Sequence, residues 1–277
     1  MLRFVLVGPK AVGKSSIFSR LSPQANGFAK FGSSQTIPIP PALFSVVTLD
    51  FPSPTFSSLT QRDSIPQVFS NAHAVIFVLS DPKDESMVEL YSLLMRHNFS
   101  QKRFILLHQI DKYEKDAQTS KLNELALNAE KVGIPITNCF ATSLFDGSLS
   151  KTFSKIVTSQ MPHFNQLQIY VNLIAQACQA NRVIICDSAT FLPICDSSDN
   201  RSENPQPICE YFLKIYPKKK SIKTISFECE SSIVVFTMVS ATTGIFVSSS
   251  SSNITTDSIL FNIKRSLPKL QELIITK

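Results

Sequence analysis

The chain has few of the features that mark secreted, zinc-binding, nucleic-acid-binding or membrane-spanning proteins. Its six cysteines include no C-x-x-C pair and its four histidines are scattered, so the sequence contains no spacing typical of a zinc site. The cysteines are therefore expected to be reduced thiols with a structural role. The apolar run "AVIFVL" at 74–79 is far too short for a bilayer, and no secretory leader is evident. The net charge is only +6, so nucleic acid is not indicated as a partner. These absences predict a cytoplasmic protein without a transmembrane segment.

Glycine is scarce, yet two glycines define the clearest motif. The chain has 7 glycines, and Gly8 to Ser15 fits G-x-x-x-x-G-K-S directly after the apolar run at 4–7. Such a loop binds phosphate through its backbone N–H groups, while the lysine neutralises phosphate charge and the serine hydroxyl ligates Mg²⁺. A helix starting near Ser15 would direct its positive end at the same phosphates. The residues expected at the phosphates are Gly8, Ala11, Val12, Gly13, Lys14, Ser15 and Ser16.

Strand-like and helix-like segments alternate after this loop, which predicts a mostly parallel sheet with helices on both faces. Strands are expected at 42–50, 73–81, 103–111 and 136–143, and helices at 84–97, 120–133 and 148–161. Ligands of such sheets bind at the carboxyl ends of the strands, where the phosphate loop, "HQID" (108–111) and "ATS" (141–143) can converge.

The pattern changes after residue 162, which predicts two domains, 1–162 and 163–277. The second domain reads as an α+β module without a catalytic constellation, and packing or dimerisation is its simplest role. Its expected helices lie at 167–178, 208–216 and 257–275, and its expected strands at 182–188, 190–197, 223–230, 231–240 and 243–249.

The tetrad "HQID" indicates which base is bound. Ras-type GTPases carry N-K-x-D or a variant at this position, and its aspartate accepts hydrogen bonds from guanine N1–H and the 2-amino group. Asp111 fits that role, and adenine would leave its carboxylate unpaired. The loop "ATS", with Ser143, fits the segment whose backbone contacts the base oxygen. A strand that simply ends in a polar tetrad remains the alternative explanation.

Over nearly its whole length the chain resembles the Rag/Gtr GTPases of the A/B type. That family has an H-K-x-D motif, matched at His108 and Asp111 but not at Gln109, and a Q-R-D stretch, matched at 61–63. "SLFDGSL" (143–149) is similar to a further family stretch, and "NRVIICDSATFLPI" (181–194) is very similar to the start of the family's roadblock domain. The resemblance implies a Ras-like P-loop G domain followed by an α+β roadblock/longin-like domain.

The resemblance also implies cofactors, partners and a cellular role. It implies GTP or GDP with Mg²⁺, and a heterodimer with a C/D-type Rag protein. It implies binding to TOR complex 1 components and to a membrane-anchored scaffold complex at the lysosome or vacuole, in response to amino acids. By match to the family, Thr36 and Asp50 join Ser15 around Mg²⁺, while His108, Gln109, Asp111 and Ser143 surround the base.

Three departures from the family pattern are visible. Gln109 replaces the lysine that stacks on the base and braces the phosphate loop. Only fourteen residues separate Thr36 from Asp50, and the three prolines among them leave room for about one strand, so we expect the usual edge strand to be lost or shortened. Asp50 is followed by Phe-Pro-Ser-Pro instead of Gly-Gly-Gln, so no glutamine is placed to orient water.

These observations predict a GTP-binding, Rag-like regulatory subunit with very slow intrinsic hydrolysis and no catalytic residue of its own. The first alternative is a pseudo-GTPase scaffold that binds nucleotide constitutively or not at all, with little or no hydrolysis. A P-loop ATPase or kinase is the second, and it would leave Asp111 and the roadblock-like half unexplained.

Overall fold

A computed structural model describes most of the chain. The described residues are 1–21, 42–50, 69, 71–84, 86, 88–89, 91–92, 101–197, 224–229 and 231–274. They form two compact units. One comprises Leu2–Pro38 and Phe44–Thr152, and the other comprises Met1, Ile39–Leu43 and Phe153–Lys277. Each unit is described by itself.

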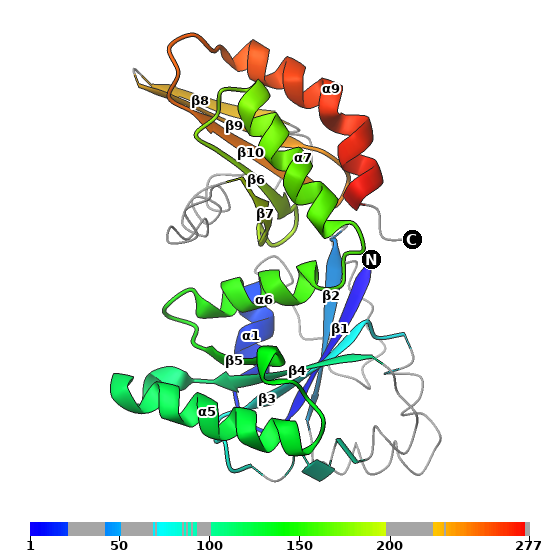
Figure 1. Ribbon diagram of the computed structural model, residues 1–277, viewed down its shortest axis with the longest axis vertical. Coiled ribbons are helices and arrows are strands. Elements are labelled where there is room, and N and C mark those ends of the chain that lie inside the picture. The colour runs from blue at the N-terminus through cyan, green and yellow to red at the C-terminus, as the bar shows by residue number, and fades with distance from the viewer. Residues whose placement is uncertain are drawn as a thin grey trace. The chain divides into compact units, whose positions relative to one another are not determined.

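The first unit is built on a parallel sheet whose described strands follow the order β2-β1-β3-β4-β5 (Figure 1). Its strands are β1 (Leu2–Gly8), β2 (Phe44–Asp50), β3 (Ala74–Leu79), β4 (Lys102–His108) and β5 (Cys139–Thr142). Its helical elements are α1 (Lys14–Leu21), η1 (Ile110–Lys112), α5 (Lys115–Lys131) and η2 (Ile136–Asn138), and α6 (Ser148–Thr158) runs across the residue at which the units divide. The expected alternation of strand and helix is confirmed.

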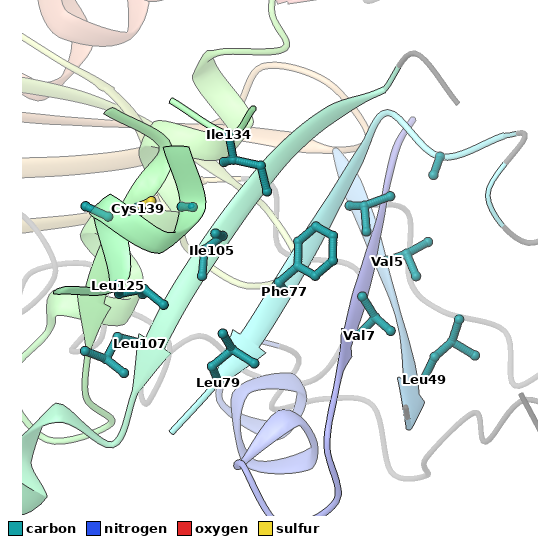
Figure 2. Close-up of a cluster of buried hydrophobic side chains, with 14 of the residues drawn as sticks. Val5, Val7, Leu49, Phe77, Leu79, Ile105, Leu107, Leu125, Ile134 and Cys139 are labelled. Atoms are coloured by element: carbon teal, nitrogen blue, oxygen red, sulfur yellow. The ribbon is translucent and has the colours of Figure 1, made fainter. Parts of the chain in front are cut away.

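Apolar side chains bury both faces of this sheet. Figure 2 shows the cluster between the sheet and α5, to which β1, β3 and β4 contribute alternate buried residues and β2 and β5 contribute one buried residue each. Its labelled members include Val5, Val7, Leu49, Phe77, Leu79, Ile105, Leu107 and Leu125. On the opposite face α1 contacts β1 and β2 and buries Ile17 and Phe18. Side chains on both faces of β1 and β3 are buried because parallel sheets are covered by helices on each side.

Two of the expected elements of the first unit differ clearly from the structure. Helix α5 begins at Lys115 instead of residue 120, and it ends before Gly133, whose φ of 75° is left-handed. The expected strand at 136–143 is split into the short helix η2 and the four-residue β5. In the expected helix at 84–97, the described residues support capping by Asp84, since its Oδ1 accepts the Ser86 N–H at 2.9 Å.

The second unit contains an antiparallel sheet whose described strands follow the order β7-β6-β10-β9-β8 (Figure 1). Its strands are β6 (Arg182–Asp187), β7 (Pro193–Asp196), β8 (Thr224–Cys229), β9 (Ser232–Met238) and β10 (Thr243–Ser249). Helices α7 (Phe164–Ala177) and α9 (Thr256–Ile274) lie side by side and contact the sheet through β6, β7 and β9. The expected helix at 208–216 lies outside the described residues.

A buried carboxylate organises the turn between β6 and β7. Asp187 is fully buried, and its oxygens accept hydrogen bonds from the N–H of Leu43, Ala189 and Thr190 and from the Thr190 hydroxyl. Burial nevertheless raises the pKa of Asp187 above its usual range, although these donors lower it. Because this turn continues to Phe191, at φ 54°, β7 begins at Pro193 instead of residue 190.

The two architectures confirm the expected fold class. The first unit has the expected α/β architecture, a parallel sheet with the G-x-x-x-x-G-K-S loop after β1, and the second unit has the expected α+β architecture, an antiparallel sheet covered by helices. Among the described residues, none of the helices has both the length and the apolarity that a bilayer crossing needs.

Candidate nucleotide-binding site

The first unit brings the chemically distinctive segments to one edge of its sheet. All of its strand pairings are parallel, so the carboxyl ends of the strands face the same way. Gly8 ends β1 beside Asp50 of β2, and His108 ends β4 beside Thr142 of β5. The phosphate-loop sequence, the "HQID" tetrad and the "ATS" segment therefore all leave the sheet at the edge where ligands bind.

The loop from Gly8 to Lys14 has a backbone that only small residues permit. A Cβ on Gly8 would lie 2.1 Å from the Val78 carbonyl oxygen, and the φ angles of Ala11 and Gly13 are 65° and 94°. Consecutive N–H groups in such left-handed turns form a concave surface suited to anions. The sequence folds locally in this way because a glycine stands at each end, where side chains would collide.

Lys14 closes the loop and begins the helix that follows. Its Nζ donates to the Gly8 carbonyl at 2.7 Å and also to the Pro9 carbonyl, and its side chain is buried. The Ile17 N–H donates to the Gly13 carbonyl at 2.9 Å, so α1 starts at the loop itself. The first N–H groups of a helix have no intrahelical acceptor and carry partial positive charge. Lys14, Ser15 and Ser16 thus lie at a positive helix end, as the motif predicts.

His108 is buried directly against this loop. Its ring is 1 % exposed, and a Cβ on Gly13 would lie 2.7 Å from its Cδ2 and 3.0 Å from its Nε2. Nδ1 lies 3.0 Å from Thr142 Oγ1, whereas the buried Nε2 has no hydrogen-bond partner in the described structure. Burial is the main cause that lowers the pKa of His108, with Lys112 lowering it further and Asp111 and Thr142 raising it. The neutral imidazole therefore links β4, β5 and the loop.

The residues that follow His108 lie at the same edge of the sheet, and Asp111 and Lys112 are exposed there. Gln109 has a left-handed φ of 62°, and its Nε2 lies 3.4 Å from the position of a Cβ on Gly13. Its Oε1 accepts a hydrogen bond from Lys112 Nζ. Asp111 is exposed in η1, so its carboxylate is open to a ligand. Lys112 was not among the residues expected at this edge, and its contact with Gln109 places it beside them.

The loop after β5 is fixed by its own hydrogen bonds. The Ser143 N–H donates to Ser148 Oγ at 2.8 Å, and Ser143 Oγ accepts the Phe145 N–H at 3.2 Å. Asp146 Oδ1 accepts from both the N–H and the hydroxyl of Ser148. Ser143 is therefore engaged within the loop, and Leu144 is the next residue available to offer its backbone to a base.

A cavity of about 670 Å³ opens between α1 and this loop. Its lining residues are Ser15, Ser16, Ser19, Arg20, Leu144 and Phe145. The Phe145 side chain is 85 % exposed, which is unusual for an aromatic ring and leaves its faces open to stacking. The cavity thus borders the phosphate-loop helix on one side and an apolar ring on the other. The sequence predicts the position of this loop but not the cavity, because the cavity depends on how α1 and the loop pack.

Two expected metal-binding residues are described only partly or not at all. Thr36 lies outside the described residues. Asp50 ends β2 in register with Gly8, which places its backbone at the ligand edge, but its side chain is outside the described part of the chain. The residues that follow it, 51–68, are likewise outside.

The chain matches known guanine-nucleotide-binding proteins. The family model "Gtr1/RagA G protein conserved region" matches residues 3–234. Ras-related GTP-binding protein A of Dictyostelium discoideum is 27 % identical over 146 residues, 50 % of this chain and 48 % of that protein. GTP-binding protein GTR1 of Saccharomyces cerevisiae is 26 % identical over 192 residues, 66 % of this chain and 61 % of that protein.

Two solved structures are similar to part of the chain. A probable GTP-binding protein, engB, has a TM-score of 0.39 and 15 % identity, covering 57 % of this chain and 99 % of its own. Myxococcus xanthus MglB has a TM-score of 0.35 and 12 % identity, covering 42 % of this chain and 95 % of its own.

The match to the curated relatives is partial in length, since the chain spans between about half and three fifths of the two relatives described above. The family model, by contrast, matches most of the chain, from the first strand through β9. The chain therefore belongs to the Gtr1/RagA family of G proteins.

Proposed function

We propose that the chain is a Rag-like regulatory subunit that binds GTP and GDP at the carboxyl edge of its parallel sheet. The observation that carries this proposal is the packing of the His108 ring on Gly13, which joins the phosphate loop and the base-recognition segment into one site. The unpartnered, buried Nε2 next to Gly13 supports it further. An unpaired buried polar group costs about 1–3 kcal/mol, a cost that a bound ligand or water would remove.

The phosphates are assigned to the loop and its lysine. Backbone N–H groups of 11–16 and the Lys14 ammonium would neutralise the β- and γ-phosphates at the positive end of α1. Mg²⁺ would be held by the exposed Ser15 hydroxyl, by Thr36 and by Asp50, with phosphate oxygens completing its shell. When bound, the ion would screen charge between the phosphates.

The base is assigned to the two loops that flank His108 and Thr142. The exposed Asp111 carboxylate would accept hydrogen bonds from guanine N1–H and the 2-amino group. The Gln109 side chain, which lies against the loop, would cover one face of the base. Leu144 would offer its backbone to the base oxygen, because Ser143 is engaged with Ser148 and Phe145. Phe145 borders the cavity in which the sugar would lie.

The second unit is assigned to dimerisation with a C/D-type Rag protein. Strand β8 is the last strand in the sheet order, and among the described residues it pairs with β9 alone. The outermost strand of a sheet can pair with a strand of another chain, and Phe227 on β8 is 39 % exposed. In this role the heterodimer would be recruited to lysosome or vacuole by a membrane-anchored scaffold complex and would bind TOR complex 1 components.

A pseudo-GTPase scaffold is the second candidate function. The sequence after Asp50 motivates it, because Phe51-Pro52-Ser53-Pro54 offers neither a glycine N–H for the γ-phosphate nor a glutamine for water. In this case a bound nucleotide would stabilise the fold, and its hydrolysis would not switch the protein between two states.

Nucleotide competition on the purified full chain tests the proposal. Fluorescent GDP is bound first, and displacement by GTP, GDP and ATP is titrated with Mg²⁺ present. We expect GTP and GDP to displace the probe at far lower concentrations than ATP, and Lys14→Ala to abolish probe binding. Lys115→Ala, an exposed lysine at the start of α5, is the matched control and should bind normally. Equal displacement by ATP and GTP would contradict guanine recognition, and absence of probe binding would favour the scaffold.

Co-purification with a C/D-type Rag protein tests the dimer assignment. We expect the full chain to form a one-to-one complex in light scattering, and Phe227→Lys to weaken it by placing charge at the strand edge. Phe261→Lys is the matched control, since Phe261 is exposed on helix α9 instead of on β8. A complex that tolerates Phe227→Lys but is lost with Phe261→Lys would move the interface to the helices.

A further inference from the structure

We propose that Lys112 supplies, through Gln109, the function of the lysine that the guanine motif of this chain lacks. In this arrangement Lys112 is a positioning residue that fixes the Gln109 amide against the phosphate loop. The inference rests on the proposed nucleotide binding and specifies how that site compensates for its altered tetrad.

The backbone places Gln109 and Lys112 one above the other. Gln109 precedes η1, and the Lys112 N–H donates to the Gln109 carbonyl at 3.0 Å. The two side chains also meet, since Lys112 Nζ donates a hydrogen bond to Gln109 Oε1. Gln109 also adopts a left-handed φ of 62°, which a non-glycine residue adopts at a cost of about 1 kcal/mol or more. Such a conformation persists where surrounding contacts hold it.

The Gln109 amide is oriented by its two neighbours. A glutamine amide has one acceptor oxygen and one NH₂ donor group. The oxygen accepts from Lys112 Nζ, and Nε2 lies 3.4 Å from the position of a Cβ on Gly13. With its acceptor held by an ammonium group, the amide presents its donors to the phosphate-loop side. The Gln109 side chain would then be held beside the proposed base site.

The charge of Lys112 also reaches the site. A hydrogen bond from an ammonium group polarises the amide and strengthens the donor at its other end. Lys112 additionally contributes to the lowering of the His108 pKa, after the larger effect of burial. A lysine at position 109 would place its own ammonium group near the phosphate loop. In this chain the ammonium group belongs to Lys112 and acts on the loop through the Gln109 amide.

A double-mutant cycle on the full chain tests this inference. The dissociation constant of fluorescent GDP is measured for the wild type, Lys112→Met, Lys112→Arg and Lys115→Met. Lys115→Met is the matched control, because Lys115 is an exposed lysine that begins α5. We expect Lys112→Met to weaken binding about three- to fivefold, the size of one exposed charge contact, and Lys112→Arg to restore it. Lys115→Met should bind as the wild type does.

The second arm repeats Lys112→Met in a Gln109→Met background. If Lys112 acts through Gln109, removing the amide removes the effect, and Lys112→Met causes no further loss. An equal loss in both backgrounds overturns the inference, since Lys112 would then act as a general positive charge. Unchanged binding of Lys112→Met in the wild-type background overturns it too, while the proposed function stands. If the wild type binds no guanine nucleotide, both the function and the inference fail.

Discussion

His108 and Thr142 end two neighbouring strands as register partners, and their side chains meet at 3.0 Å between Nδ1 and Oγ1. This contact ties the base-recognition segment of β4 to the loop after β5. Because the opposite side of the imidazole packs on Gly13, one ring sets the spacing of three segments. The fold itself therefore holds together the three segments that we propose bind the nucleotide.

The first prediction concerns pH. The His108 pKa is lowered in the folded chain relative to its ordinary value of 6.5, so below that value the unfolded chain binds more protons than the folded one. The stability contributed by neutral His108 is full above pH 6.5 and decreases as pH falls toward the folded pKa. We expect urea unfolding at pH 7.5 and 5.5 to show a larger loss for the wild type than for His108→Gln. His163→Gln, at an exposed histidine, should behave as the wild type does.

The second prediction concerns base specificity. Asp111→Asn replaces a double acceptor with an amide, which would mismatch guanine and match the N1 and O2 groups of xanthine. We expect the variant to lose GDP affinity at least tenfold, about 1.4 kcal/mol, and to prefer xanthosine diphosphate. Competition between the two diphosphates for a fluorescent probe measures this preference. Asp116→Asn, at an exposed aspartate in the first turn of α5, is the control. Retained guanine preference in Asp111→Asn would remove Asp111 from the base site.

The third prediction concerns hydrolysis. In the sequence, the six residues after Asp50 contain no glutamine and include two prolines, which restrict backbone rearrangement. We therefore expect single-turnover GTP hydrolysis at or below roughly 10⁻⁴ per second, the scale of an unassisted Ras-type site. Radiolabelled GTP on the purified chain measures it. A rate about a hundredfold higher would contradict this prediction. If that rate were lost in Lys14→Ala but retained in Gln61→Leu, the chain would use a catalytic group other than Gln61.

The fourth prediction concerns stability of the second unit. Asp187→Ala removes the acceptor of three backbone N–H groups and one hydroxyl in a fully buried position. We expect the free energy of unfolding to fall by about 3 kcal/mol, because buried donors are left unpaired. Chemical denaturation measures the loss. Asp257→Ala, at an exposed position in the first turn of α9, should change it little.

Local sequence patterns predicted the parts of the site that depend on the backbone. The phosphate loop is specified by glycine spacing, and the order of strands and helices follows from hydrophobic periodicity, so Lys14 and His108 are placed as expected. The early start of α5 at Lys115 was missed because that stretch is polar and lacks an apolar periodicity.

The contacts between side chains were not predictable in the same way. The hydrogen bond between Lys112 and Gln109 depends on the left-handed backbone of Gln109. A glycine would have indicated such a conformation in the sequence, but position 109 is a glutamine. The cavity beside Phe145 depends on how α1 packs near the loop after β5. Engagement of Ser143 by Ser148 depends on the turn made by Asp146. Each follows from tertiary packing instead of from a local preference.

The central position of β1 has a consequence for synthesis of the chain. β1 pairs with β2 on one side and β3 on the other, and β3 ends only at Leu79. At ribosomal rates of about 5–20 residues per second, roughly four to fourteen seconds separate the emergence of Gly8 from that of Leu79. For that interval the apolar, β-prone strand β1 exists without β3, its neighbour on one side. The nascent chain is therefore open to chaperones, and to aggregation, at β1, the strand that leads into the G-x-x-x-x-G-K-S loop.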